Sequence, residues 1–274
     1  MMWKKLPQAE RDAAYDNAAA VPGSAARIAR WDLASRDVRA EQPAHLNIAY
    51  GPKERNKWDL FPSHSEAPCL VFIHGGYWLR NSREIFACMA SGVRSHGWSA
   101  ALPGYTLAPQ ASLREIAAEV RAALDWFCLH RRNYAICGPV IVSGWSAGGH
   151  LATLGLDHEG VTAGLAISGL YELGPLRDTA YNQILNLTDL EIETLSPMRG
   201  PITMKPLILA YGENELPALI ANSRDFHVRR SRSRAPGRIL ALAGHDHFSL
   251  LEELRSTDGA LTRAALDLAA GNWD

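Results

Sequence analysis

The sequence predicts an α/β domain built on a mostly parallel sheet that helices cover on both faces. Two observations predict this fold class. Short apolar runs, several of them ending at glycine, alternate along the chain with stretches of helical periodicity. These runs are apolar throughout, which is typical of strands buried on both faces of a parallel sheet. With 274 residues, 47% of them hydrophobic, the chain is long enough for one large core.

The elements follow one another in a regular order after an N-terminal extension. Residues 1–45 are rich in alanine and charge, and they predict one or two helices packed outside the core. The predicted strands lie within 45–51, 57–63, 69–78, 98–105, 139–143, 161–171, 205–215 and 237–248. The predicted helices lie within 112–132, 147–156, 216–231, 249–256 and 260–270. We therefore expect a single domain over residues 1–274, with residues 172–200 as a small charged insertion resembling a cap.

Composition limits the partners that this chain can bind. It has 28 basic and 29 acidic residues, a net charge of −1, so no strong field attracts nucleic acid or an anionic membrane. No apolar run approaches the length of a membrane helix, and no signal-peptide core follows the first lysines. The four cysteines form no C-x-x-C pair and read as buried thiols. We expect a cytoplasmic protein that acts on a small molecule.

The strongest motif is Gly144-Trp145-Ser146-Ala147-Gly148, which has the pattern G-x-S-x-G. It lies between an apolar strand and a helix rich in alanine and leucine. A serine on such a sharp turn needs small neighbours, and the turn lifts its hydroxyl clear of the sheet. The N–H of Ala147 then points from the helix N-terminus toward the same space and can bind an oxyanion. We therefore predict Ser146 as a nucleophile.

A glycine-rich loop follows an earlier apolar strand, as the second half of an oxyanion hole should. Gly75 and Gly76 allow backbone N–H groups to approach a substrate closely. His74 is expected to hydrogen-bond this loop rather than to act as a base. Tyr77 and Trp78 are either core residues or walls of a substrate pocket, and the sequence leaves both interpretations open.

A serine nucleophile needs a base, and the base needs a carboxylate that orients it. His247 is the preferred base because it follows a late strand in a polar loop and stands at the start of a helix. His245 is expected to support the same loop, and Asp246 is a poor partner because neighbouring side chains point apart. The acid is expected after the preceding strand, where Glu213 and Glu215 are the candidates. The His-Asp-His triplet lacks the spacing of a metal site, so no metal and no cofactor is expected.

Together these motifs identify a resemblance. The segments HGGYW, LPGYTLAP, GWSAGGHLA, YGENELP and HDHF resemble the arylformamidase (kynurenine formamidase)-like branch of the α/β-hydrolase esterases, over about residues 45–255. The resemblance implies the α/β-hydrolase fold and an oxyanion hole of Gly75, Gly76 and Ala147. In that family the acid follows a strand in a G-x-x-Asp pattern. Gly212-x-x-Glu215 matches this pattern with Glu in place of Asp, so the resemblance favours Glu215 over Glu213. It also implies Ser146, Glu215 and His247 as the catalytic residues.

The predicted function is that of a serine hydrolase that cleaves a carboxylic ester or small amide through an acyl-enzyme. An aryl formamide such as N-formylkynurenine is one candidate substrate. The alternatives are a short-chain or aryl carboxylesterase, a hydrolase of carbamates or other amides, and a non-catalytic receptor on the same fold. Four aromatic residues are expected in the substrate pocket, namely Tyr77, Trp78, Trp145 and Tyr171. Whether the N-terminal helices mediate a homodimer or fold over the active site is left open.

Overall fold

The centre of the molecule is one eight-stranded sheet with the strand order β1-β2-β4-β3-β5-β6-β7-β8. The computed structural model describes residues 3–42 and 45–273. Neighbouring strands from β4 to β8 are parallel, whereas β1 and β2 form an antiparallel edge. The strands are β1 (Ile48–Ala49), β2 (Lys57–Phe61), β3 (Cys69–Ile73), β4 (Ser99–Pro103), β5 (Val140–Trp145), β6 (Ala163–Ile167), β7 (Leu207–Gly212) and β8 (Ile239–Leu242). The predicted mostly parallel sheet and α/β fold class are confirmed.

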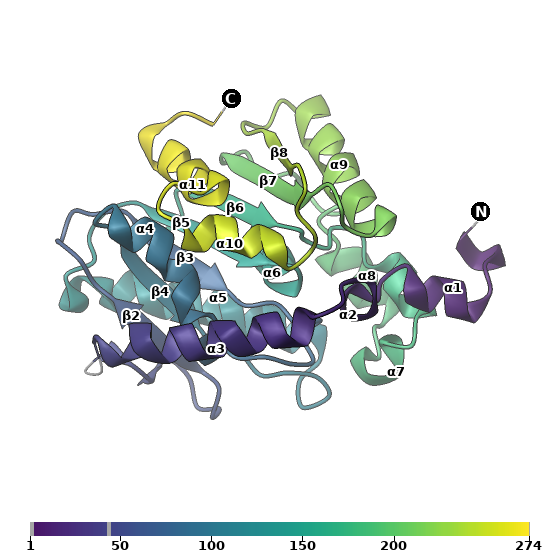
Figure 1. The fold of residues 1–274 in the computed structure, drawn as a ribbon, viewed down its shortest axis with the longest axis horizontal. Helices are drawn as coiled ribbons and strands as arrows, with labels where there is room; N and C mark the ends of the chain where they lie inside the picture. Colours follow the sequence, from purple (N-terminus) through teal and green to yellow (C-terminus); the bar gives the residue numbers. More distant parts are fainter. Residues whose placement is uncertain (1–2, 43–44, 274) are drawn as a thin grey trace.

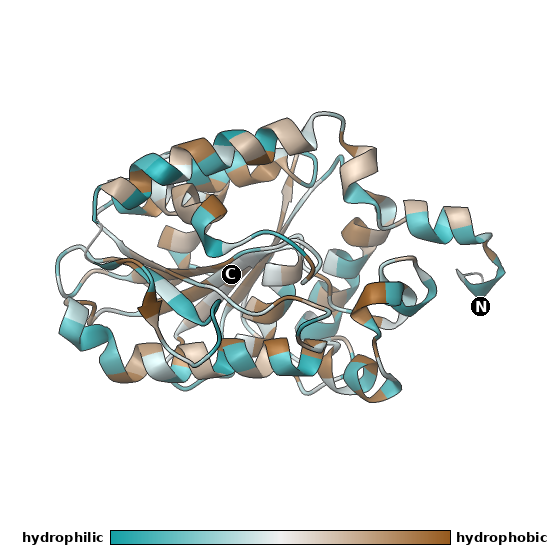
Figure 2. Cartoon of the chain, turned by 90° about the horizontal axis from the view of Figure 1, so that it is seen from below, coloured by the Kyte–Doolittle hydropathy of each residue, from teal (hydrophilic) through white to brown (hydrophobic). Residues whose placement is uncertain are grey.

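Two hydrophobic cores lie on opposite faces of this sheet, because alternate strand residues point to opposite sides. On β3, Val71 and Ile73 join one core, and Leu70 and Phe72 join the other. The first core is covered by α5 (Leu113–His130), α6 (Ala147–Gly155) and α9 (Pro217–Arg232). The second is covered by α3 (Ser24–Ala40), η3 (Arg83–Ala90), α4 (Ser91–Ser95), α10 (Glu252–Arg255) and α11 (Ala260–Ala270). Figure 2 shows hydrophobic strands enclosed by helices whose outer faces are hydrophilic.

The helix α5 illustrates how the local sequence sets an element. Ser112 precedes it, and the Ser112 hydroxyl accepts a hydrogen bond from the N–H of Glu115 while the Glu115 carboxylate accepts from the N–H of Ser112. This reciprocal capping satisfies two N–H groups that the first helical turn leaves without partners. Ile116, Val120 and Phe127 then bury one face of the helix against the sheet. The helical periodicity that predicted this element is confirmed.

The N-terminal segment forms more elements than the one or two helices predicted. It contains η1 (Trp3–Lys5), α1 (Gln8–Ala13), α2 (Asn17–Ala20) and the long helix α3. α3 lies along the sheet, and its Trp31 is fully buried against Phe86 and Trp145. Figure 1 shows α1 and α2 beside α7 (Asn182–Leu185) and α8 (Asp189–Leu195), far from them in sequence. The N-terminal segment therefore packs against the region that contains residues 172–200.

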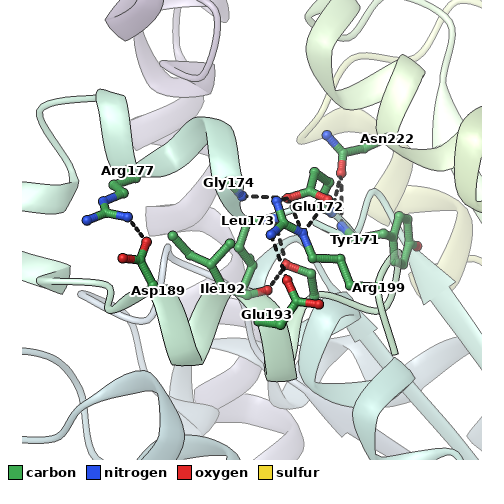
Figure 3. Close-up of polar contacts among 11 residues, drawn as sticks. Tyr171, Glu172, Leu173, Gly174, Arg177, Asp189, Ile192, Glu193, Arg199 and Asn222 are labelled. Atoms are coloured by element: carbon green, nitrogen blue, oxygen red, sulfur yellow. Dashed lines mark hydrogen bonds and ion pairs between the residues drawn. The ribbon is translucent and has the colours of Figure 1, made fainter. Parts of the chain in front are cut away.

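Residues 172–200 consist of η5 (Gly174–Asp178), α7 and α8 joined by short loops. Ion pairs link Arg199 to Glu172 and Glu193, and Arg177 to Asp189, as Figure 3 shows. These side chains are partly exposed, so each pair contributes little to stability. A buried contact holds the segment more firmly, because Asn222 Oδ1 on α9 accepts hydrogen bonds from the N–H groups of Tyr171 and Glu172, both at 2.9 Å.

None of the helices in the described ranges is long and apolar enough to cross a membrane. Within residues 3–42 and 45–273, no three histidine, cysteine, aspartate or glutamate side chains gather as a metal ion would require. Cys69 and Cys88 are buried free thiols.

Candidate active site

Ser146 stands on the sharp turn between β5 and α6. Its backbone has φ 57° and ψ −119°, a conformation that is rare for a residue with a side chain. Close packing of two glycines makes the turn possible. A Cβ on Gly148 would lie 2.0 Å from the Ile73 carbonyl oxygen, and one on Gly144 would lie 2.2 Å from that of Gly148. The turn is also held to β6, because the Ser146 N–H donates to the Ile167 carbonyl at 2.8 Å.

His247 and Glu215 meet at the same edge of the sheet. Glu215 follows β7 and His247 follows β8, and their Nδ1 and Oε2 atoms are 2.8 Å apart. Both side chains are buried, with exposed fractions of 3% for His247 and 0% for Glu215. A short buried contact between a carboxylate and an imidazole fixes the ring's orientation and its tautomer. The Ser146, Glu215 and His247 side chains therefore come from three loops at the carboxyl ends of parallel strands, where α/β sheets place their sites.

Two further groups hold the Glu215 carboxylate. Its Oε1 accepts hydrogen bonds from the Ser168 hydroxyl and the Gly212 N–H, both at 2.6 Å. Sequence reasoning did not single out Ser168, although its place directly after β6 was a usable signal. Glu213 lies on the surface, and Glu215 is the residue in contact with the histidine.

The loop that carries His247 is fixed by contacts that do not use its ring. Trp145 Nε1 donates to the His247 carbonyl at 2.8 Å. Asp246 Oδ1 accepts from the N–H groups of Phe248 and Ser249, so its carboxylate caps η6 (Ser249–Leu251) instead of facing His247. The His245 carbonyl accepts from the Asn214 N–H at 3.0 Å and so joins the two loops. The backbone at position 245 thus supports the loop, and the supporting role expected of the His245 side chain stays a prediction.

The glycine-rich loop lies directly against the elbow. A Cβ on Gly75 would lie 2.5 Å from the Trp145 carbonyl oxygen and 3.1 Å from Ser146 Cβ. His74 Nδ1 hydrogen-bonds the Gly75 carbonyl at 3.0 Å, and Asn81 Nδ2 donates to the same oxygen at 3.2 Å. The predicted structural role of His74 is thereby confirmed. The loop therefore lies against the turn that carries Ser146 and leads into the first turn of α6, whose N–H groups have no partner within the helix.

A cavity of about 140 Å³ opens beside Ser146 and His247. Gly76, Tyr77, Trp145 and Phe248 line it from the core of the molecule. The opposite wall comes from the N-terminal segment, and its residues are Asn17, Ala18, Ser24, Ala25 and Ile28. The N-terminal helices α2 and α3 therefore lie over the site. This is one of the two alternatives that the sequence left open for the N-terminal helices, although nothing in residues 17–28 marks them as neighbours of Ser146.

Comparison with known proteins agrees with this architecture. Residues 60–166 match a family model described as BD-FAE. The chain is 22% identical to a kynurenine formamidase of Danio rerio, with 97% of this chain and 98% of the relative covered. A kynurenine formamidase of Salmo salar is 25% identical over 81% of each chain. Among solved structures, one assigned as a thioesterase from Silicibacter sp. TM1040 superposes with a TM-score of 0.82 at 28% identity, covering 92% of this chain and 97% of the other.

A hyperthermophilic esterase of Pyrobaculum calidifontis superposes with a TM-score of 0.71 at 14% identity, over 92% of this chain and 94% of the other. In this chain the strained serine between β5 and α6 has the strand-to-helix geometry of a nucleophile elbow. The chain has the α/β-hydrolase fold. Its similarity to esterases and formamidases supports the serine-esterase, arylformamidase-like branch that the motifs predicted.

The aromatic residues predicted for the substrate pocket of this hydrolase divide into two groups. Tyr77 and Trp145 line the cavity. Trp78 and Tyr171 are fully buried elsewhere among the described residues and do not line it. Trp78 packs edge-on against His150, and Tyr171 stacks on Phe226 of α9. The structure therefore contradicts the expectation that these two rings face the substrate, because both rings are used in the core.

Tyr77 joins the N-terminal wall to the rest of the hydrolase. Its hydroxyl donates to the Tyr15 carbonyl at 2.6 Å, and its ring stacks on Tyr181 with the centroids 4.1 Å apart. Asp12 Oδ1 accepts from the Ala180 N–H at 2.7 Å, and Gln8 Nε2 donates to the Asp178 carbonyl at 2.9 Å. These contacts hold residues 8–15 to Tyr77 and to the segment 172–200.

Two buried histidines of the hydrolase predict a loss of stability in acid. Burial lowers the pKa of His74 to about 3 and that of His150 to about 4, so both are neutral in the folded state. In the unfolded chain each takes up a proton below about pH 6.5. The free energy of unfolding is therefore expected to be highest above pH 6.5 and to fall as the pH drops toward 4.

Urea unfolding at several pH values measures this effect. His150 Nε2 contacts the Leu195 carbonyl at 2.7 Å, and His150→Gln keeps a donor for this carbonyl. This variant is expected to show a weaker dependence of the free energy of unfolding on pH. His64→Gln on the surface is the matched control and should leave the slope unchanged. An equal slope in the parent protein and in His150→Gln would contradict the prediction.

Proposed function

We propose that this α/β-hydrolase is a serine hydrolase that cleaves a small carboxylic ester or amide through an acyl-enzyme. The observation that carries the proposal is the 2.8 Å contact between buried Glu215 and His247 beside the strained Ser146. Serine is a weak nucleophile alone, and a neighbouring histidine held in one tautomer by a carboxylate is the usual means of activating it.

In the proposed reaction the Ser146 hydroxyl attacks the substrate carbonyl while His247 Nε2 takes its proton. Glu215, held by Ser168 and Gly212, orients the imidazole and stabilises the imidazolium that forms. The N–H groups of Gly75, Gly76 and Ala147 are proposed to bind the oxyanion, each contributing roughly 3 kcal/mol to the barrier reduction. His247 then protonates the leaving group and activates the water that releases the acid and regenerates Ser146.

The size of the cavity supports a small substrate. Its volume of about 140 Å³ is close to that of cavities that hold one benzene-sized group. Such a space accepts a short acyl group or one aromatic ring. An aryl formamide such as N-formylkynurenine is the sharpest candidate, since three curated relatives are named kynurenine formamidases. Short-chain and aryl esters are the competing candidates, supported by the esterases among the structural neighbours.

Direct kinetics test the proposal and separate the candidates. We expect the protein to hydrolyse 4-nitrophenyl acetate and to lose this activity after labelling by one equivalent of a fluorophosphonate. The ratio of kcat/KM for N-formylkynurenine to that for phenyl acetate then decides between formamidase and esterase. Failure of the protein to react with the fluorophosphonate would contradict the acyl-enzyme mechanism. Absence of kynurenine release at micromolar enzyme would remove the formamidase candidate alone.

A further inference from the structure

Arg80 is the one residue with a permanent charge among the described residues that line the cavity beside Ser146. The other lining residues are apolar or uncharged, apart from the proposed base His247. The Arg80 side chain is exposed, and none of the ion pairs between described residues includes it. Within the part of the chain that the structure describes, its one side-chain partner is the neutral Tyr181, which leaves the positive charge uncompensated and available to an anionic ligand.

The other arginines near this loop are used inside the protein. Arg83 pairs with Asp59 at 3.1 Å and with Glu84 at 2.8 Å. Arg55 donates to the carbonyls of Tyr105 and Asn81, at 2.8 and 2.6 Å. Arg80 differs from both of them because, within the described ranges, its guanidinium pairs with no carboxylate and donates to no backbone carbonyl.

An acidic side chain near the same aromatic rings is already engaged. Asp16, like Arg80, acts electrostatically on Tyr77 and Tyr181, both of whose pKa values are raised, chiefly by burial. Its Oδ1 accepts the N–H of Ala19 at 3.0 Å and so caps α2. Asp16 lies beyond ion-pair distance of Arg80, so the positive charge at the cavity is not neutralised by a direct partner.

The backbone of Arg80 is fixed relative to the glycine-rich loop. The Arg80 N–H donates to the Gly76 carbonyl at 3.1 Å. The following residue, Asn81, donates through Nδ2 to the Gly75 carbonyl and accepts from Arg55 at its own carbonyl. The side chain of Arg80 therefore starts from a rigid position next to the proposed oxyanion hole, which limits the positions that its guanidinium can reach.

We propose that Arg80 binds a carboxylate that the substrate carries beyond its scissile bond. The inference rests on the proposed function and names the substrate class, namely esters or amides of small molecules with a second, anionic end. The cavity accommodates one small group beside Ser146, and the rest of the substrate lies at the mouth with Arg80. A guanidinium binds a carboxylate through two parallel hydrogen bonds, which gives orientation as well as affinity.

A matched pair of esters tests this assignment. 4-Acetoxybenzoate and 4-acetoxybenzamide have the same acyl group and nearly the same shape, but only the first is an anion. The measured quantity is kcat/KM for 4-acetoxybenzoate divided by kcat/KM for 4-acetoxybenzamide. We expect Arg80→Met to lower this ratio about tenfold, which is the effect of losing one charge-assisted contact. Arg80→Lys should retain part of the ratio because the charge remains. Arg132→Met removes an exposed arginine of η4 (Arg131–Tyr134), at the opposite end of β5, and should leave the ratio unchanged.

Two measurements separate this inference from the proposed function. The first is calorimetry, which requires no turnover. It compares the binding of 4-hydroxybenzoate with that of 4-hydroxybenzamide, in the parent protein and in Arg80→Met. The preference for the anion should weaken as sodium chloride is added, because an exposed charge pair is screened. A ratio that is equal in the parent and Arg80→Met, in both kinetics and binding, would overturn the inference. If neither ester is hydrolysed, the proposed function fails, and the binding preference alone decides the role of Arg80.

Discussion

Replacing Ser146 with alanine is expected to lower kcat/KM for 4-nitrophenyl acetate by about 10⁴-fold or more. Nucleophile variants of serine hydrolases lose this much because no acyl-enzyme forms and only binding and oxyanion stabilisation remain. The measurement is initial-rate kinetics with a correction for the uncatalysed reaction. Fluorophosphonate labelling, followed by intact mass, should show one adduct on the parent protein and none on the variant.

A second serine provides the matched control. Ser143 lies on the same strand, β5, and is buried, and its hydroxyl donates to the Leu165 carbonyl at 2.8 Å. Ser143→Ala is expected to cost about 1 kcal/mol of stability while kcat/KM stays within a small factor of the parent. Equal activity of Ser146→Ala and the parent protein would refute the proposed mechanism.

Glu215→Gln is expected to lower kcat by about 10³- to 10⁴-fold with a smaller change in KM. The amide can still hydrogen-bond His247, but it no longer stabilises the imidazolium and favours the wrong tautomer. Two hydrogen bonds to Oε1, from Ser168 and Gly212, are 2.6 Å long and hold the side chain in place, so the fold should survive the change. The pH dependence of kcat/KM and the thermal unfolding midpoint are measured on the same preparations.

Glu213 provides the matched control for Glu215→Gln. From the residues alone, either Glu213 or Glu215 could be the acid. The Glu213 side chain is exposed on the same turn, so Glu213→Gln is expected to keep nearly full activity. Glu215→Asp retains the charge but shortens the reach to His247, and an intermediate loss is expected. A larger loss in Glu213→Gln than in Glu215→Gln would reverse the assignment of the acid.

The parts of the site that the sequence predicts are those that local chemistry determines. The elbow around Ser146 requires glycines on either side, and these stand within one short motif. Glu215 and His247 were predicted because each follows a strand, and the ends of parallel strands meet at one edge. The fold class was predictable for the same reason, since strands buried on both faces are apolar throughout.

The parts that were missed depend on contacts between residues distant in sequence. Tyr171 follows β6 as a pocket residue should, but Asn222 binds its backbone N–H and its ring stacks on Phe226. η3 and α4 cover residues 83–95, where no element was predicted, and Gly92 inside α4 weakened the helical pattern. A Cβ on Gly92 would lie 2.2 Å from Thr262 Oγ1, so close packing against a residue 170 positions away requires glycine here. The local sequence around Gly92 does not predict this contact.

The cavity wall formed by α2 and α3 has a consequence for how the site is assembled during synthesis. Asn17 and Ile28 are synthesised before every strand of the sheet, whereas His247 is synthesised after β8. The wall has no cavity to close until β7 and β8 have placed Glu215 and His247 at the sheet edge. The site is thus completed only after β8 is in place, when residues 17–28 and 247–248 meet around Ser146, so hydrolytic activity would report on completion of the fold.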